Sequence, residues 1–132
     1  MNNGKRNRRK GHQFERDIAI QLREIGYPNA KRHLEYQEGE ANGIDISGVP
    51  GFAIQCKNKQ KYVSVNTIKE IQVEGFDIPI VISKAKREEP MAIMRWEDLM
   101  IMMSILKETE GHINKTFEER KSDREKKYNS ID

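Results

Sequence analysis

The first strong hydrophobic pattern in the chain predicts an amphipathic helix that follows Gly11. Apolar residues recur there three or four positions apart, a spacing that places them on one helical face. Gly26 and Pro28 then end the pattern. The apolar positions of this predicted helix are Phe14, Ile18, Leu22 and Ile25.

Short strands are predicted in the next part of the chain. Residues 30–36 are expected to form the first of them, and the polar, glycine-containing residues 37–43 are expected to form a loop. Residues 44–46 and 52–57 read as the two arms of a hairpin across the Pro50-Gly51 turn.

The side chains of this hairpin divide between two faces, because successive residues of a strand point in opposite directions. We expect Gln55 and Lys57 to share one face with Asp45. The hairpin thus brings a carboxylate, an amide and an ammonium group together. The apolar residues expected on the opposite face are Ile44, Ile46, Phe52, Ile54 and Cys56.

The second half of the chain is predicted to add a helix at 66–74, strands at 78–83 and 91–95, and a helix at 96–106. The strand at 78–83 is almost wholly apolar, as expected of a buried strand, and Pro79 is expected near its start. The resulting order, α-β-β-β-α-β-β-α, predicts an α/β fold with a mixed central sheet flanked by helices. The apolar last helix belongs either to the core or to a dimer face.

Length and composition favour one compact domain with charged ends. The chain has 132 residues, of which 34% are charged and 36% hydrophobic. We expect a basic arm at residues 1–11, a folded domain at 12–106, and a charged tail at 107–132 that is either a solvated helix or disordered. Neither a membrane-spanning segment nor a signal peptide is expected, and a single cysteine agrees with a cytoplasmic location.

Basic residues concentrate near the N-terminus, although the net charge of the chain is only +3. Such a run attracts phosphates without sequence specificity, and taken alone it fits a solubilising tail equally well. Further basic residues follow two of the predicted strands. The expected phosphate contacts are Lys5, Arg6, Arg8, Arg9, Lys10, Lys59, Lys61, Lys84, Lys86 and Arg87.

The oxygen donors of the hairpin are of the kind that Mg²⁺ prefers. Asp45 offers a carboxylate, Gln55 an amide oxygen, and Cys56 a main-chain carbonyl. Lys57 is placed to position a water molecule and to stabilise the charge that develops on a phosphate. Each residue alone is ordinary strand surface, and a Gln-x-Lys triplet alone is weak evidence for a site.

The hairpin and the first helix together resemble the core of PD-(D/E)xK nucleases. In that superfamily Asp ends one strand, and an acidic residue or Gln precedes Lys by two positions on the next, as in Asp45 and Gln55-Cys56-Lys57. The segment Lys10-Gly11-His12-Gln13-Phe14-Glu15 is similar to the first helix of archaeal- and phage-type Holliday junction resolvases, which makes Glu15 the further acidic ligand. The resemblance spans residues 10–106 and leaves the tail unexplained.

The chain departs from the family pattern at two positions. Ile44 stands where the family name has Pro, and Gln55 replaces the commoner Glu or Asp. A neutral amide lowers the negative charge around the metal ion, so Glu15 is expected to carry more of the binding.

The resemblance implies a restriction-endonuclease-like fold with an αβββαβ core and a Mg²⁺-dependent endonuclease activity that Mn²⁺ also supports. It implies catalytic roles for Glu15, Asp45, Gln55 and Lys57, with the Cys56 carbonyl as a further metal ligand. The expected substrate is a four-way DNA junction in recombination and repair, cut by a homodimer, in the host-cell cytoplasm if the protein is of phage origin. The alternatives are a restriction, repair or nicking endonuclease acting on duplex DNA, and a catalytically inactive DNA-binding relative.

Overall fold

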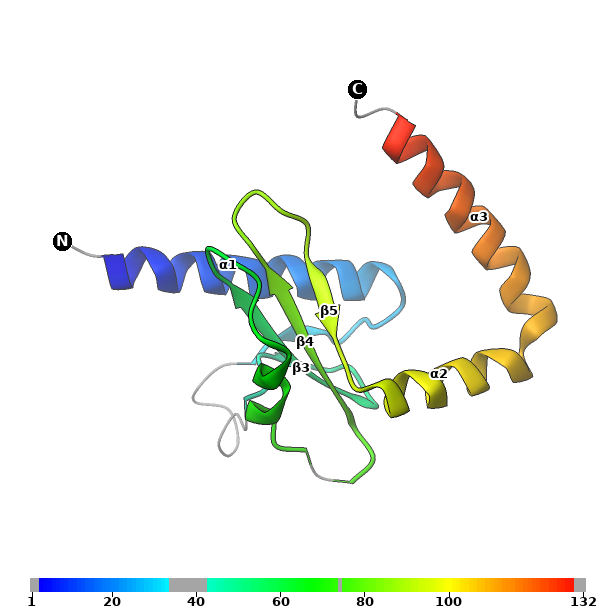
Figure 1. Ribbon diagram of the computed structural model, residues 1–132, viewed down its shortest axis with the longest axis horizontal. Helices are drawn as coiled ribbons and strands as arrows, with labels where there is room; N and C mark the ends of the chain where they lie inside the picture. Colours follow the sequence, from blue (N-terminus) through cyan, green and yellow to red (C-terminus); the bar gives the residue numbers. More distant parts are fainter. Residues whose placement is uncertain (1–2, 34–42, 74, 130–132) are drawn as a thin grey trace. The chain divides into compact units, whose positions relative to one another are not determined.

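The computed structural model describes residues 3–33, 43–73 and 75–129 (Figure 1). The chain forms two compact units, Met1–Arg95 and Trp96–Asp132. The division thus falls after Arg95, whereas the sequence analysis places the end of the folded domain at residue 106.

The described residues of the first unit form a five-stranded mixed sheet in the order β1-β2-β3-β4-β5. β3 and β4 are parallel, and the other neighbouring strands are antiparallel. The predicted α/β class is confirmed at this level. The strands are β1 (Lys31–Arg32), β2 (Ile46–Ser47), β3 (Phe52–Asn58), β4 (Ile78–Lys84) and β5 (Met91–Ile93).

The first helix, α1 (Asn3–Glu24), begins well before the position that the apolar pattern indicates. Apolar spacing marks only the part of a helix that packs on a core, whereas the preceding turns of α1 are exposed and basic. Lys and Arg are good helix formers, so the basic segment is helical from Asn3 onward and continuous with the packed part of α1.

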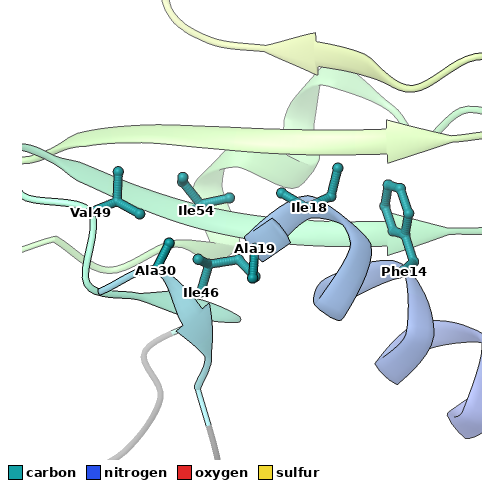
Figure 2. Close-up of a cluster of buried hydrophobic side chains, with 7 residues drawn as sticks. All are labelled: Phe14, Ile18, Ala19, Ala30, Ile46, Val49 and Ile54. Carbon is teal, nitrogen blue, oxygen red and sulfur yellow. The ribbon is translucent and has the colours of Figure 1, made fainter. Parts of the chain in front are cut away.

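One face of the sheet packs against α1 through a cluster of buried side chains (Figure 2). Ile54 of β3 and Ile46 of β2 meet Phe14 and Ile18 of α1 in this cluster. Gly48, in the turn after β2, has a φ of +80°, and a Cβ there would lie 1.9 Å from the Asn29 carbonyl oxygen. The turn therefore requires glycine. The cluster comprises Phe14, Ile18, Ala19, Ala30, Ile46, Val49 and Ile54.

The opposite face of the sheet packs against a short 3-10 helix, η1 (Val65–Glu70), which lies between β3 and β4 in the chain. Ala53 belongs to this second cluster and its neighbour Ile54 to the first, so the two clusters cover opposite faces. The buried members of the second cluster are Ala53, Ile68, Ile71 and Val81.

The α-helix predicted at 66–74 is wrong in type and length. The segment is the 3-10 helix η1, which Ser64 caps by accepting a hydrogen bond from the main-chain N–H of Asn66. It ends where Ile71 adopts an extended conformation and enters the core. Tertiary packing thus overrides a helical pattern too short to persist alone.

Two predicted strands, those at 52–57 and 78–83, are each one residue longer in the structure, and the other three differ in their bounds. β5 stops at Ile93, and the strand predicted at 78–83 is confirmed as β4, in which Pro79 lies outside the pairing with β5. β1 covers Lys31–Arg32, and residues 34–36 of the predicted strand lie outside the described residues.

The predicted alternation of the first hairpin arm is wrong at Ile44. Ile44 packs against the second cluster whereas Ile46 belongs to the first, because the regular strand β2 begins only at Ile46. Asp45 nevertheless continues the main-chain pairing, with its carbonyl oxygen accepting from His33 N–H and its N–H donating to the Ile54 carbonyl.

The second unit contains α2 (Trp96–Glu108), where a helix is predicted, and α3 (Glu110–Asn129). The tail is therefore helical through most of its length. All residues of α2 are described and none of them is buried. Within the described ranges, we find no helix with both the length and the apolar character that crossing a membrane requires.

Candidate functional site

A cleft of about 700 Å³ opens in the first unit between α1 and the carboxyl ends of β3 and β4. Five polar positions singled out from the sequence meet in it, and we call them the cleft floor: Glu15, Asp45, Gln55, Cys56 and Lys57. Five cations line it as well, and we call them the rim: Lys10, Lys59, Lys84, Lys86 and Arg87. The remaining predicted phosphate contacts, Lys5, Arg6, Arg8, Arg9 and Lys61, are exposed and lie outside the lining.

Asp45 is held against β3 by its side chain as well as its main chain. Its Oδ2 accepts a hydrogen bond of 2.8 Å from the main-chain N–H of Cys56. Its own N–H donates to the Ile54 carbonyl oxygen at 2.8 Å. The carboxylate is therefore fixed beside the Gln-x-Lys strand, with its second oxygen left for another partner.

Gly43 brings the chain to Asp45 along a path with no room for a side chain. Its φ is +78°, and a Cβ there would lie 2.5 Å from the main-chain carbonyl oxygen of Glu70, the last residue of η1. Glycine is needed here for both the backbone conformation and the close approach.

Gln55 is the most buried member of the cleft floor, with 5% of its surface exposed. Its Oε1 finds no hydrogen-bond donor among the described residues. Leaving a buried acceptor unsatisfied costs about 1–3 kcal/mol, so such a group calls for an explanation. A cation bound beside Asp45 would supply the missing partner.

Lys57 follows Gln55 by two residues on the same face of β3. Its Nζ lies 3.7 Å from Oε1 of Glu70, so the ammonium group has an ion-pair partner on η1. Both groups are partly exposed, and such a pair stabilises the fold by at most about 1 kcal/mol. The pair thus leaves the ammonium group at the cleft without holding it firmly.

Glu15 reaches the cleft from α1 and is bound by an arginine that the sequence analysis does not single out. Oε2 of Glu15 accepts a hydrogen bond of 2.8 Å from Nε of Arg32 on β1. Burial raises the pKa of Glu15, and the nearby charge of Asp45 raises it further, whereas Arg32 opposes the shift.

The pKa of Asp45 is also raised, mainly by burial. The hydrogen bond from Cys56 and the charge of Lys57 oppose this shift without cancelling it. Two neighbouring carboxyl groups thus have pKa values that burial raises despite the positive charges nearby. Sites of this kind are frequently functional.

The donor set fits a hard divalent cation. The Glu15 and Asp45 carboxylates each keep one oxygen beyond the hydrogen bonds described, and Gln55 contributes an unsatisfied oxygen. Burial raises the pKa of the Cys56 thiol, so its main-chain carbonyl, not a thiolate, is the suitable donor. Across the described ranges, no three His, Cys, Asp or Glu residues form a group that could hold a metal ion.

Several residues of the cleft are absent from the sequence-based predictions. Arg32 is 17 positions from Glu15, and no local pattern indicates their contact. Asn7 and Asp17, by contrast, lie at helical spacing from the predicted Lys10 and Phe14, a signal that would have emerged had the predicted helix been extended toward the N-terminus. The other lining residues not predicted are Gly11, Gln13, Asn58 and Gln60.

Comparisons with protein-family models, with curated proteins and with solved structures find no match for this chain. The functional interpretation therefore rests on the residues of the cleft themselves.

Proposed function

We propose that this chain is a Mg²⁺-dependent DNA endonuclease of the PD-(D/E)xK type, with a restriction-endonuclease-like fold, and that it resolves four-way DNA junctions. The observation that carries the proposal is the cleft floor. A partly buried carboxylate pair, an unsatisfied amide oxygen and a lysine line one cleft whose rim is cationic.

The residues of the cleft floor have different proposed roles in hydrolysis. Glu15, Asp45, Gln55 and the Cys56 carbonyl would hold Mg²⁺, which lowers the pKa of a water molecule and offsets charge on the phosphate. Lys57 orients the attacking water and stabilises the negative charge that builds on the phosphate oxygens. The Cys56 N–H keeps the Asp45 carboxylate in position throughout.

The rim recruits the substrate through its phosphates. Six cations line the cleft, namely Lys57 and the five rim residues, against the three carboxylates of Glu15, Asp17 and Asp45. Cations of this kind bind the backbone of any sequence, and release of counterions supplies much of the affinity. Selection by the shape of a branched DNA suits such a surface better than selection by sequence.

Resolution of a four-way junction needs two symmetric cuts, so the proposed enzyme acts as a homodimer. α2 favours a second copy of this chain as its partner. Large apolar side chains are exposed on this helix, although a monomer rarely exposes an extensive apolar patch. They are Trp96, Met100, Ile101, Met103, Ile105 and Leu106.

The central part of α2 suits a symmetric, dry contact. Residues 99–106 carry no charge, so two copies meet without repulsion. The one polar side chain in this stretch, Ser104, donates its hydroxyl hydrogen to the Ile101 carbonyl at 2.7 Å and loses no partner on burial. A stable dimer buries about 800 Å² per subunit, of which six large apolar side chains supply a substantial part.

A cleavage assay with matched substrates tests the activity. A four-way junction and a linear duplex built from the same arm sequences are incubated with Mg²⁺, with Mn²⁺ or with a chelator. We expect both metals to support cleavage of the junction, and Asp45→Ala or Lys57→Ala to abolish cleavage while DNA binding remains.

Each alternative has its own signature in the same assay. Equal cleavage of junction and duplex identifies a restriction, repair or nicking endonuclease instead of a resolvase. Binding without cleavage under every metal condition identifies an inactive DNA-binding relative. Unchanged cleavage by Asp45→Ala shows that the active site lies elsewhere.

Light scattering at micromolar concentration tests the dimer. We expect a mass near twice the 15.4 kDa of one chain, and a monomer for the double variant Ile101→Glu/Ile105→Glu. Val65→Glu, at an exposed apolar residue of the first unit, is the matched control and leaves the mass unchanged. A monomeric wild-type protein contradicts the dimer.

A further inference from the structure

The turn between β4 and β5 forms part of the rim and carries three of its cations. Lys84 ends β4, and Lys86 and Arg87 follow it in the turn with exposed side chains. Glu88 and Glu89 belong to the same turn but lie outside the lining of the cleft. The turn therefore presents its positive residues to the cleft.

Three hydrogen bonds hold this turn to residues 59–62, which we call the clamp segment. The bonds engage the beginning, the middle and the end of the turn, so the turn is fixed along its whole length. They join Lys59 N–H to the Lys84 carbonyl at 3.0 Å, Lys86 N–H to the Gln60 carbonyl at 3.3 Å, and the Tyr62 hydroxyl to the Glu89 carbonyl at 2.6 Å.

Arg87 adopts a backbone conformation that a side chain of its kind rarely takes. Its φ is +63°, the only positive φ outside glycine in the described part of the chain. A hydrogen bond from Glu88 N–H to the Ala85 carbonyl closes the turn around it. Such a conformation persists only where the surroundings enforce it, and it occurs preferentially at ligand-binding sites.

The cations of the turn follow Lys57 of the cleft floor along one line of neighbouring residues. Lys57 and Lys59 are two residues apart on extended chain, a separation of about 6–7 Å. Successive phosphates of one strand rise about 3.4 Å along the duplex axis and lie further apart than that in space, so this separation corresponds to one or two steps along a strand. Lys59 is joined in turn to Lys84 by the clamp, so a strand with one phosphate at Lys57 brings a neighbouring phosphate to the turn.

We propose that residues 84–89, fixed by the clamp segment, are a preformed site for a phosphate one or two nucleotides from the scissile one. Lys86 and Arg87 bind that phosphate, and Tyr62 is a positioning residue that holds the turn for them. The Lys84 ammonium group donates to the Ala85 carbonyl at 3.2 Å and stays at the base of the turn. The ligand is the phosphodiester backbone of a nucleic-acid strand, so the inference rests on the proposed function.

Two substitutions test the site without disturbing the cleft floor. Tyr62→Phe removes only the hydroxyl group that binds the Glu89 carbonyl. Arg87→Asn removes the guanidinium group and keeps a residue that tolerates a positive φ. Lys69→Asn, at an exposed cation of η1 outside the cleft lining, is the matched control for the loss of one charge.

The measurement is the affinity for a fluorescent four-way junction across a series of salt concentrations, with Ca²⁺ in place of Mg²⁺. We expect Arg87→Asn to weaken binding about 10-fold and to reduce the slope of log affinity against log salt by about 0.9. Tyr62→Phe is expected to weaken binding about 3- to 5-fold and to lower the same slope. With Mg²⁺, both variants raise KM and keep kcat, and Lys69→Asn behaves as wild type.

The possible results separate the phosphate site from the nuclease. If the wild type cuts junctions and both variants bind and cut as it does, the phosphate site is wrong and the nuclease stands. If Tyr62→Phe lowers only the thermal midpoint and leaves the salt slope unchanged, its role is structural and the positioning role is wrong. If the wild type neither binds nor cuts DNA, both proposals fall.

Discussion

The cleft floor and α2 depart from the usual distribution of side chains in opposite directions. The floor buries Gln55 and partly buries the charged Asp45, whereas α2 exposes large apolar side chains such as Ile101. Buried polar groups and exposed apolar patches are the informative exceptions in a folded chain. The partners that we propose would satisfy these groups, namely a cation with its phosphate at the cleft floor and an apolar surface at α2.

The largest effect is expected from a substitution at Asp45 that changes activity and stability in opposite directions. Asp45→Asn keeps the size of the side chain and removes its charge, so we expect cleavage to fall by at least about 10³-fold. Because burial raises the pKa of Asp45, the same change should raise the free energy of unfolding at neutral pH. Cleavage rates and thermal unfolding test this; a loss of both activity and stability would show that the charge supports the fold.

The next effect contrasts core packing with the exposed helix. Phe14→Ala empties part of the buried cluster on α1 and should lower the free energy of unfolding by about 3–5 kcal/mol. Ile101→Ala, on exposed α2, should change the unfolding of the monomer by less than about 0.5 kcal/mol. Chemical denaturation at a protein concentration low enough to keep the chain monomeric measures both, and equal losses would show that α2 is packed in the monomer.

A smaller effect concerns Gln55, whose neutral amide adds no negative charge to the proposed metal site. Gln55→Glu restores the commoner acidic residue and should tighten Mg²⁺ binding by roughly 10-fold, or about 1.4 kcal/mol. Calorimetric titration with Mg²⁺ measures it, with Gln60→Glu on the cleft wall as a control for added charge alone. Equal tightening by both variants would show that Gln55 has no direct contact with the ion.

The smallest effect is the pH dependence of metal-free stability. The pKa values of Glu15 and Asp45 are raised in the folded state, so the folded chain binds more protons than the unfolded one between the ordinary and the raised values. Their stabilising contribution is complete below the ordinary carboxyl pKa and is lost as pH rises through the raised values. Unfolding of wild type and Asp45→Asn across this range should diverge as pH rises, and parallel profiles would contradict the shift.

Local signals predict the cleft floor well, because its strand members lie close together in the sequence. Alternation along β3 places Gln55 and Lys57 on one face, and a single turn brings Asp45 beside them. Strand β4 and helix α2 are likewise visible in short apolar patterns.

Contacts between distant segments have no such signal. Arg32 contacts Glu15, and Glu70 contacts Lys57, because the fold brings α1 beside β1 and η1 beside β3. The apolar pattern also misses the basic beginning of α1, since exposed turns need no apolar residues. The nuclease activity, its metal ion and the dimer stay predictions, because fold class alone does not determine function.

Glu70 constrains the hairpin at two places: its main-chain carbonyl oxygen leaves no room for a side chain at Gly43, and its carboxylate pairs with Lys57 on β3. In a saturation mutagenesis screen, Gly43 should therefore tolerate substitution as poorly as the residues for which we propose catalytic roles. Its intolerance would have a steric origin, since any side chain there pushes the approach to Asp45 away from η1. Mutational sensitivity at this position would measure the alignment of the two arms, not participation in the reaction.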